Sequence, residues 1–264
     1  MPRRRVLALI ALLCALLGMS GVAAAQLATA APVLCDQYAS TPVQGGRYIV
    51  MNNRWGTSAT QCVDVSGTGF TVTQADGSVA TNGAPKSYPA VFYGCHYSSC
   101  TTNGNILSPN GLQASDPRFA SISTSVSMTY PSSGTYDAAY DIWFNQQQPS
   151  SGTGRNNGLE MMIWLNSSGV QPIGSQVASR VGIGGGTWDV WSSSSAGPPV
   201  VSYRANPAVS STPASFNIKP FVDDAVNVRR MLQTSWWLSS IQAGFEIWSG
   251  GTNARVNSFS AGVN

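Results

Sequence analysis

The sequence predicts an all-β protein: a jelly roll of two stacked antiparallel β-sheets, with a concave cleft and one short helix. Three observations support this fold. Apolar and polar residues alternate with a period of two in many short segments, and Asn-Gly, Ser-Gly and Gly-Gly turn signals separate these segments. One stretch has helical spacing instead. A length of about 230 residues after the amino-terminal leader suits one two-sheet domain.

Ten segments are predicted to be strands. The clearest is 120–130, where Ile122, Thr124, Val126 and Met128 face one way and serines face the other, as in a half-solvated antiparallel strand. In chain order, the predicted strands are 47–51, 70–73, 90–93, 120–130, 136–144, 159–165, 188–191, 200–203, 240–248 and 255–263.

A single helix is expected near residue 225. Phe221, Ala225, Val228 and Leu232 recur at helical spacing, and Pro220 suits the first helical position. Because these apolar residues share one face, we expect the helix to pack on the convex side of a sheet.

Residues 1–31 have the features of a secretory signal peptide, with cleavage expected near 25–31. Arginines at positions 3–5 precede an apolar run over 6–17, and small residues follow. The run is too short for an ordinary membrane span. We therefore expect a secreted protein with one domain over 32–264 and no membrane association.

Charge patterning argues against nucleic acid as a partner. The chain has 14 Lys+Arg and 11 Asp+Glu, and the leader holds three of the arginines, which leaves 11 of each sign after export. No basic cluster remains to bind phosphates. A neutral substrate fits better, and Lys86 is interpreted as a solvated loop residue rather than as a ligand.

Cysteine usage predicts disulfides. Without the leader the chain has four cysteines, an even number in an exported protein: Cys35, Cys62, Cys95 and Cys100. We expect sequential pairing in two disulfides. The alternative is a zinc site that uses His96, although no second histidine is present. No metal or organic cofactor is expected.

The chain contains only two glutamates, and each lies in an apolar, tryptophan-bearing segment. A carboxylate in such surroundings loses water contacts, so its charge is expected to have a use. Strand alternation places Glu160 on one face with Met162 and Trp164, and Glu246 on one face with Trp248.

Two carboxylates beside indole rings are typical of sugar chemistry. Cleavage of a glycosidic bond needs one carboxyl group that protonates the leaving oxygen and a second that attacks the sugar or activates water, while aromatic faces stack on pyranose rings. The alternative is that both glutamates are hydrogen-bonded structural residues of a Glu-poor protein.

Several motifs resemble glycoside hydrolase family 12, the small secreted endoglucanases. Glu-Met-Met-Ile-Trp at 160–164 and Gly-Phe-Glu-Ile-Trp at 244–248 resemble the two active-site strands of that family. The likeness extends over the mature chain, and the loop from Cys95 to Cys100 is similar to that of bacterial, actinomycete-like members. Further matches are Cys-Asp-Gln-Tyr at 35–38, Asn-Asn-Arg-Trp-Gly at 52–56, Ala-Tyr-Asp at 139–141 and Gln-Pro-Ile-Gly at 171–174.

The resemblance implies a role for each matching residue. Glu160 would be the nucleophile of a retaining mechanism and Glu246 its acid/base. Asp141 would be hydrogen-bonded near Glu160 and support it. Asn53 and Trp55 would bind sugars on the glycone side.

The remaining substrate-binding candidates are Met162 under the cleft floor, Trp164, Trp248 and Tyr38. Tyr38 stands where some members carry tryptophan, and stacking there would be weaker. The expected function is endo-β-1,4-glucanase activity on β-glucan polysaccharides, by a monomer. The alternatives are a xyloglucan-specific endoglucanase of the same family, a xylanase of the related family 11, and a non-catalytic glucan-binding lectin.

Overall fold

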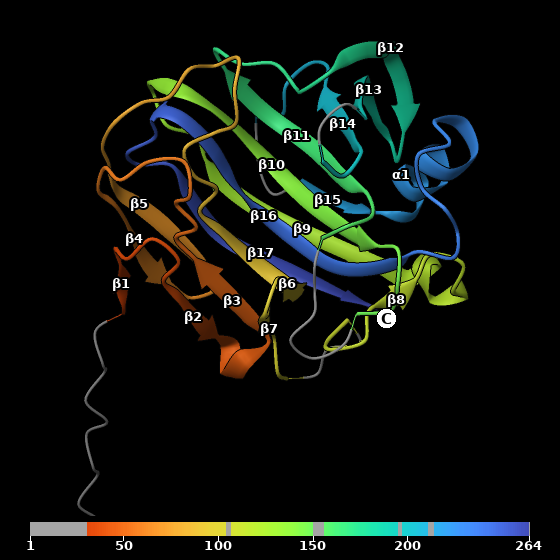
Figure 1. The fold of residues 1–264 in the computed structure, drawn as a ribbon, viewed down its shortest axis with the longest axis horizontal. Coiled ribbons are helices and arrows are strands. Elements are labelled where there is room, and N and C mark those ends of the chain that lie inside the picture. The colour runs from red at the N-terminus through yellow and green to blue at the C-terminus, as the bar shows by residue number, and fades with distance from the viewer. Residues whose placement is uncertain (1–30, 104–106, 150–155, 195–196, 211–213, 264) are drawn as a thin grey trace, which may run out of the picture. The chain divides into compact units, whose positions relative to one another are not determined.

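Two β-sheets form the protein, and the computed structural model describes residues 31–103, 107–149, 156–194, 197–210 and 214–263. Figure 1 shows the strands of both sheets running across the molecule. In spatial order, the six-stranded sheet contains β1 (Val33–Leu34), β4 (Gln61–Ser66), β5 (Gly69–Ala75), β17 (Arg255–Val263), β9 (Ile122–Thr129) and β15 (Ala214–Asn217).

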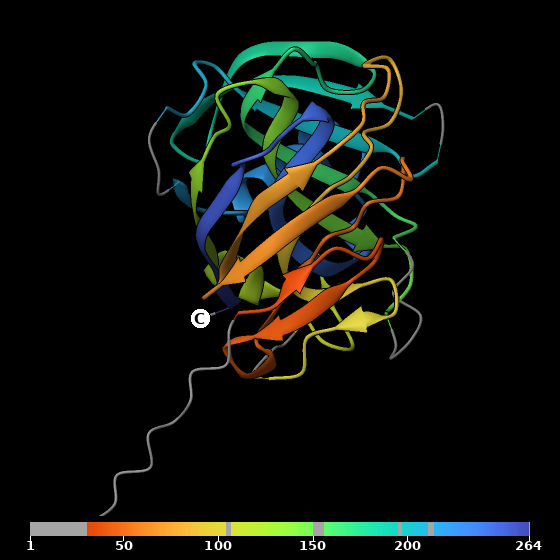
Figure 2. The same ribbon diagram turned by 90° about the vertical axis from the view of Figure 1, so that its left-hand side faces the viewer.

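The second sheet is larger and carries the cleft. Its two short outer strands are β7 (Ser99–Cys100), which pairs with β6, and β8 (Leu112–Gln113), which pairs with β16. The others, in spatial order, are β12 (Ser175–Ile183), β13 (Gly186–Ser193), β14 (Val200–Ala205), β11 (Glu160–Ser168), β10 (Gly134–Asn145), β16 (Trp237–Gly250), β6 (Ala90–His96), β3 (Tyr48–Met51) and β2 (Ser40–Val43). The red and orange amino-terminal strands gather at one side of the molecule in Figures 1 and 2.

The predicted fold class is confirmed. Every predicted strand segment overlaps an observed strand. β12 was not predicted, because most of its residues are exposed and its sequence lacks apolar alternation. One pair departs from the antiparallel pattern, since β11 and β14 run parallel.

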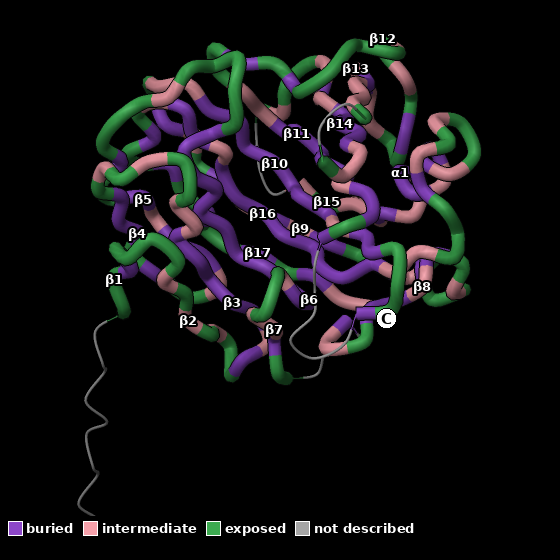
Figure 3. The backbone as a smooth tube through the Cα atoms, viewed as in Figure 1, coloured by how far each residue is buried: buried purple, intermediate pink, exposed green. Residues whose placement is uncertain are grey.

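β10 shows how the two faces of the larger sheet differ. Tyr140, Ile142 and Phe144 belong to the core between the sheets, whereas Asp137 and Asp141 point to the opposite, concave face. β11 and β16 follow the same alternation. Figure 3 shows that buried residues are concentrated along these three central strands. The charged residues of the concave face therefore lie on strands whose other face is packed in the core.

The helix is shorter than its apolar spacing predicts. α1 (Lys219–Asp223) continues as one π-helical turn over Asp224–Val228. Phe221 packs on Trp188 and Tyr203, with ring centroids 5.1 and 5.2 Å away, on the convex side of β13 and β14. Val228 is 59% exposed, so the expected apolar contact fails there. The wider π-turn changes the angular position of this residue, which rotates it away from the core.

Residues 31–264 group into one compact unit. Most of the expected signal peptide, residues 1–30, lies outside the described residues. No helix in the described part of the chain is long and apolar enough to cross a membrane.

Candidate active site

The two strands that flank β10, at the centre of the concave face, present the two glutamates. Glu160 opens β11, where its backbone N–H donates to the carbonyl of Pro199 at 3.0 Å. Met162 and Trp164 follow on the same face, and Glu246 and Trp248 lie two strands away on β16. Both glutamates remain partly open to solvent. The sequence-based assignment of faces therefore agrees with the structure.

β10 separates the two glutamate strands. Glu160 lies opposite Trp143 of β10, whereas Glu246 lies opposite Asp137, six residues away. Burial raises the pKa of Glu160 well above its usual value, and the charges of Asp141 and Glu246 raise it further.

Asp137 is a site residue that the sequence analysis missed. It is fully buried, directly opposite Glu246. Burial is the main cause that raises the pKa of Asp137 to about 8, while a hydrogen bond with Glu246 acts in the other direction. The same hydrogen bond raises the pKa of Glu246, which burial and the charge of Asp137 already raise. This pattern fits a proton carried by Glu246 and accepted by Asp137.

Asp141 affects Glu160 through its charge. Its Oδ2 accepts a hydrogen bond from the indole N–H of Trp143 at 2.7 Å. Burial is the main cause that raises the pKa of Asp141 to about 7. The charge of Asp141 in turn raises the pKa of Glu160. The charge of Asp141 therefore disfavours ionisation of Glu160.

A glutamine and the only histidine of the chain extend this cluster on β16 and β6. The Gln242 side-chain N–H donates to Nδ1 of His96 and to Oγ of Ser240, both at 2.9 Å. Burial lowers the pKa of His96 to about 4, so its Nδ1 accepts and its proton lies on Nε2. Gln242 lies opposite Asp141 in the strand register. Gln242 belongs to no recognisable sequence motif, so its contact with His96 could not be predicted.

Tyr88 places a phenol among the four carboxylates. It is buried, and burial, followed by the charges of Asp141 and Asp137, raises the pKa of Tyr88 well above its usual value. Its backbone N–H donates to the carbonyl of Asn53 at 2.9 Å. This contact fixes the segment after β3 beside the carboxylate cluster, and the next residue but one is Trp55, which is 39% exposed.

The other expected binding residues differ in accessibility. Tyr38 is 65% exposed, so its ring is open for stacking. Trp164 and Trp248 are only 2% and 4% exposed, and they pack with Met162 in one apolar cluster. These two indoles therefore form the floor of the concave face and leave little ring surface for a sugar.

One disulfide joins the segment after β1 to β4, and the other joins β6 to β7. Cys35 is bonded to Cys62, and Cys95 is bonded to Cys100, as sequential pairing predicts. Because the cysteines flanking His96 are bonded to each other, they are not available as zinc ligands. The zinc alternative is therefore wrong for this loop.

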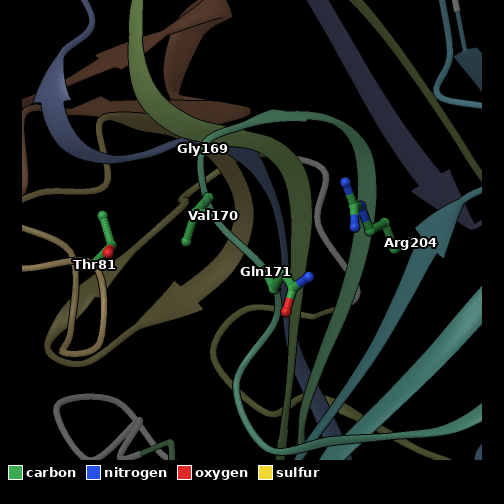
Figure 4. Close-up of a pocket in the computed structure, with 5 residues that line it drawn as sticks. All are labelled: Thr81, Gly169, Val170, Gln171 and Arg204. Atoms are coloured by element: carbon green, nitrogen blue, oxygen red, sulfur yellow. The ribbon is translucent and has the colours of Figure 1, made fainter.

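Two hollows lie near the strands that carry the glutamates. One, of about 480 Å³, is lined by residues from the segment after β11 and by Arg204 of β14 (Figure 4). The other, of about 510 Å³, is lined by Tyr97, by Asn156 and by the segment that precedes β14.

A jelly roll with paired carboxylates on its concave face defines a glycoside hydrolase. The profile of glycosyl hydrolase family 12 matches residues 46–264. This chain is 37% identical over 142 residues to the probable cellulase Cel12b of Mycobacterium tuberculosis, an alignment that covers 53% of this chain and 89% of that protein.

Solved structures agree with this match. One family 12 glycoside hydrolase is 49% identical, with a TM-score of 0.80 and coverage of 88% of this chain and 99% of the other. The endo-1,4-β-glucanase CelB2 is 43% identical, with a TM-score of 0.78 and the same coverage. The chain belongs to glycosyl hydrolase family 12.

Proposed function

We propose that the protein is a secreted endo-β-1,4-glucanase that cleaves internal bonds of cellulose and related β-glucans with retention of configuration. The observation that carries this proposal is that Glu160 and Glu246 share the concave face of the larger sheet, on the two strands that flank β10. Similarity to a probable cellulase and to an endo-1,4-β-glucanase supports the substrate class. The leader-like segment 1–31 and the two disulfides support secretion.

The proposed mechanism has two displacements. The Glu160 carboxylate attacks the anomeric carbon while Glu246 gives its proton to the glycosidic oxygen, so the leaving chain departs as an alcohol. Glu246 then removes a proton from water, whose oxygen attacks the same carbon and releases Glu160. The Asp137 contact keeps a proton on Glu246 for the first step.

The retaining assignment includes a geometric expectation. A nucleophile and an acid that flank the same anomeric carbon need carboxyl groups about 5 to 5.5 Å apart, whereas inversion needs roughly 6.5 to 9.5 Å. We expect the shorter distance between Glu160 and Glu246.

The glycone-side role of Asn53 and Trp55 comes from the resemblance of their segment to the substrate-stacking strand of the family. Asn53 and Trp55 lie beyond β3, on one side of the catalytic strands, and we assign them to the glycone side. The exposed face of Trp55 suits stacking on a pyranose ring.

One substrate panel tests the proposal. An endoglucanase lowers the viscosity of carboxymethyl cellulose well before reducing ends accumulate. Higher kcat/KM on xyloglucan than on unbranched β-glucan would assign the xyloglucan-specific alternative. Binding to these polymers without release of reducing ends would instead identify a lectin.

A further inference from the structure

The β14 side of the cleft holds an arginine that has no carboxylate partner. Arg204 lies on the concave face, opposite Trp164 of β11 and Asp189 of β13. Asp189 already accepts hydrogen bonds from the backbone N–H of Arg180 and the side-chain amide of Asn206, each at 2.9 Å. Among the described residues, the Arg204 guanidinium has no ion pair. Its guanidinium therefore makes no direct contact with a carboxylate among the described residues, although its side chain is half-buried.

This guanidinium faces the hollow of about 480 Å³, a volume within the usual range of ligand pockets. Figure 4 shows Val170 and Gln171 between Thr81 on one side and Arg204 on the other. The described lining contains no acidic residue: Thr81, Gly169, Val170, Gln171 and Arg204. The hollow therefore has a positive charge and neutral polar groups around it.

The hollow adjoins the catalytic face. Val170, which lines it, packs in the same apolar cluster as Met162, Trp164 and Trp248. Met162 and Trp248 each stand two residues after a catalytic glutamate on the same strand. A polysaccharide bound across the glutamates would therefore extend into the hollow.

Sheet order places the hollow on the leaving-group side. β14 and β3 flank the central strands β11, β10 and β16 from opposite sides. Since Trp55 beyond β3 is assigned to the glycone side, Arg204 on β14 lies on the other side of the scissile bond.

We propose that this hollow is a leaving-group subsite for carboxylated sugar units of a β-1,4-glucan, which Arg204 binds. The inference rests on the proposed function. A guanidinium binds a carboxylate through two parallel N–H donors, and this contact would neutralise a charge that is now unpaired. The carboxylate can belong to a uronic acid unit or to a carboxymethyl substituent, because both supply the same acceptor.

A kinetic test compares a charged and a neutral polymer. Arg204→Met should lower the ratio of kcat/KM on carboxymethyl cellulose to that on hydroxyethyl cellulose about tenfold, since it removes charge-assisted hydrogen bonds. Arg204→Lys should lower this ratio less, because lysine keeps the positive charge but lacks the two parallel N–H donors of the guanidinium. Arg255→Met, at an exposed position of β17 in the other sheet, is the matched control and should leave the ratio unchanged. An unchanged ratio in Arg204→Met would overturn the inference.

A binding test separates this inference from the proposed function. In a Glu160→Gln background, calorimetry compares cellotetraose with its analogue in which the reducing-end-side glucose units are oxidised to glucuronic acid. Arg204→Met should weaken the oxidised ligand about tenfold more than the neutral one. Equal weakening of both ligands would overturn charge recognition. Absence of hydrolysis by the unmodified protein would contradict the proposed function, and the binding comparison would still decide the subsite.

Discussion

Asp137 is the residue whose role depends most on the fold. It faces Glu246 across two strands that are more than 100 residues apart in sequence. A polar residue between apolar neighbours on a strand gives no indication of which residue lies opposite. Its burial and its position opposite Glu246 became visible only in the structure.

Asp137→Asn should move the basic limb of the pH–rate profile to lower pH by about one unit. The charge of Asp137 and its hydrogen bond both raise the pKa of Glu246, so their loss lets the acid deprotonate earlier as the pH rises. The measurement is kcat/KM on a neutral glucan from pH 4 to pH 10. Asp64→Asn, at an exposed position of β4, is the control and should leave the profile unchanged. A basic limb that stays in place or moves upward in Asp137→Asn contradicts the pairing.

Lys86 shows how one side chain holds several segments together. It was interpreted as a solvated loop residue, but this is wrong: it is fully buried. Its Nζ donates to the carbonyls of Ala75, Asp76 and Gly77 at 2.8 to 3.0 Å. Its backbone N–H donates to Ile247, next to Glu246. These backbone partners could not be predicted, because a lysine in a loop segment is usually solvated.

Lys86→Met should lower the free energy of unfolding by about 3 kcal/mol, because it leaves buried carbonyl groups without a donor. Urea unfolding measures this difference. Lys219→Met is the matched control, since Lys219 is half-buried and pairs with Asp223, and such a pair contributes less than about 1 kcal/mol. If both variants were equally stable, the carbonyl contacts of Lys86 would not hold this segment.

At the scale of elements, strand positions could be predicted because apolar alternation marks each strand with one buried face. The prediction missed β12, where that signal is absent, and also β4, where Val63 and Val65 do alternate with polar residues. β12 is mostly exposed and lacks the alternation. The apolar residues of this segment have helical spacing, but the π-turn places Val228 in solvent. Backbone irregularity of this kind is not encoded in the spacing of apolar residues.

At the scale of the whole molecule, the larger sheet brings motifs that are distant in sequence onto one face. Both glutamates could be proposed from their rarity and their apolar neighbours, and the structure places them on one face. Trp164 and Trp248 share that face, but their burial reflects neighbours from other segments, such as Val79 and Val170. Accessibility of this kind depends on packing between segments and not on the local sequence.

Four carboxyl groups, those of Asp137, Asp141, Glu160 and Glu246, lie on this face of the larger sheet. Burial raises the pKa of each one, and ionisation of one opposes ionisation of the next. A cluster of this kind lowers the stability of the fold at neutral pH, where an unfolded chain would ionise all four groups freely. Its retention fits a catalytic use of the carboxyl groups.

The central claim is the division of roles between the two glutamates, and the anomeric configuration of azide products tests it most directly. In Glu246→Ala, an activated aryl cellobioside still reacts with Glu160, and azide should then release a β-glycosyl azide. In Glu160→Ala, azide enters from the vacated face and should give an α-glycosyl azide. Proton NMR of the products distinguishes the two configurations. The opposite assignment would reverse the roles, and near-native activity of both variants on carboxymethyl cellulose would contradict the carboxylate pair altogether.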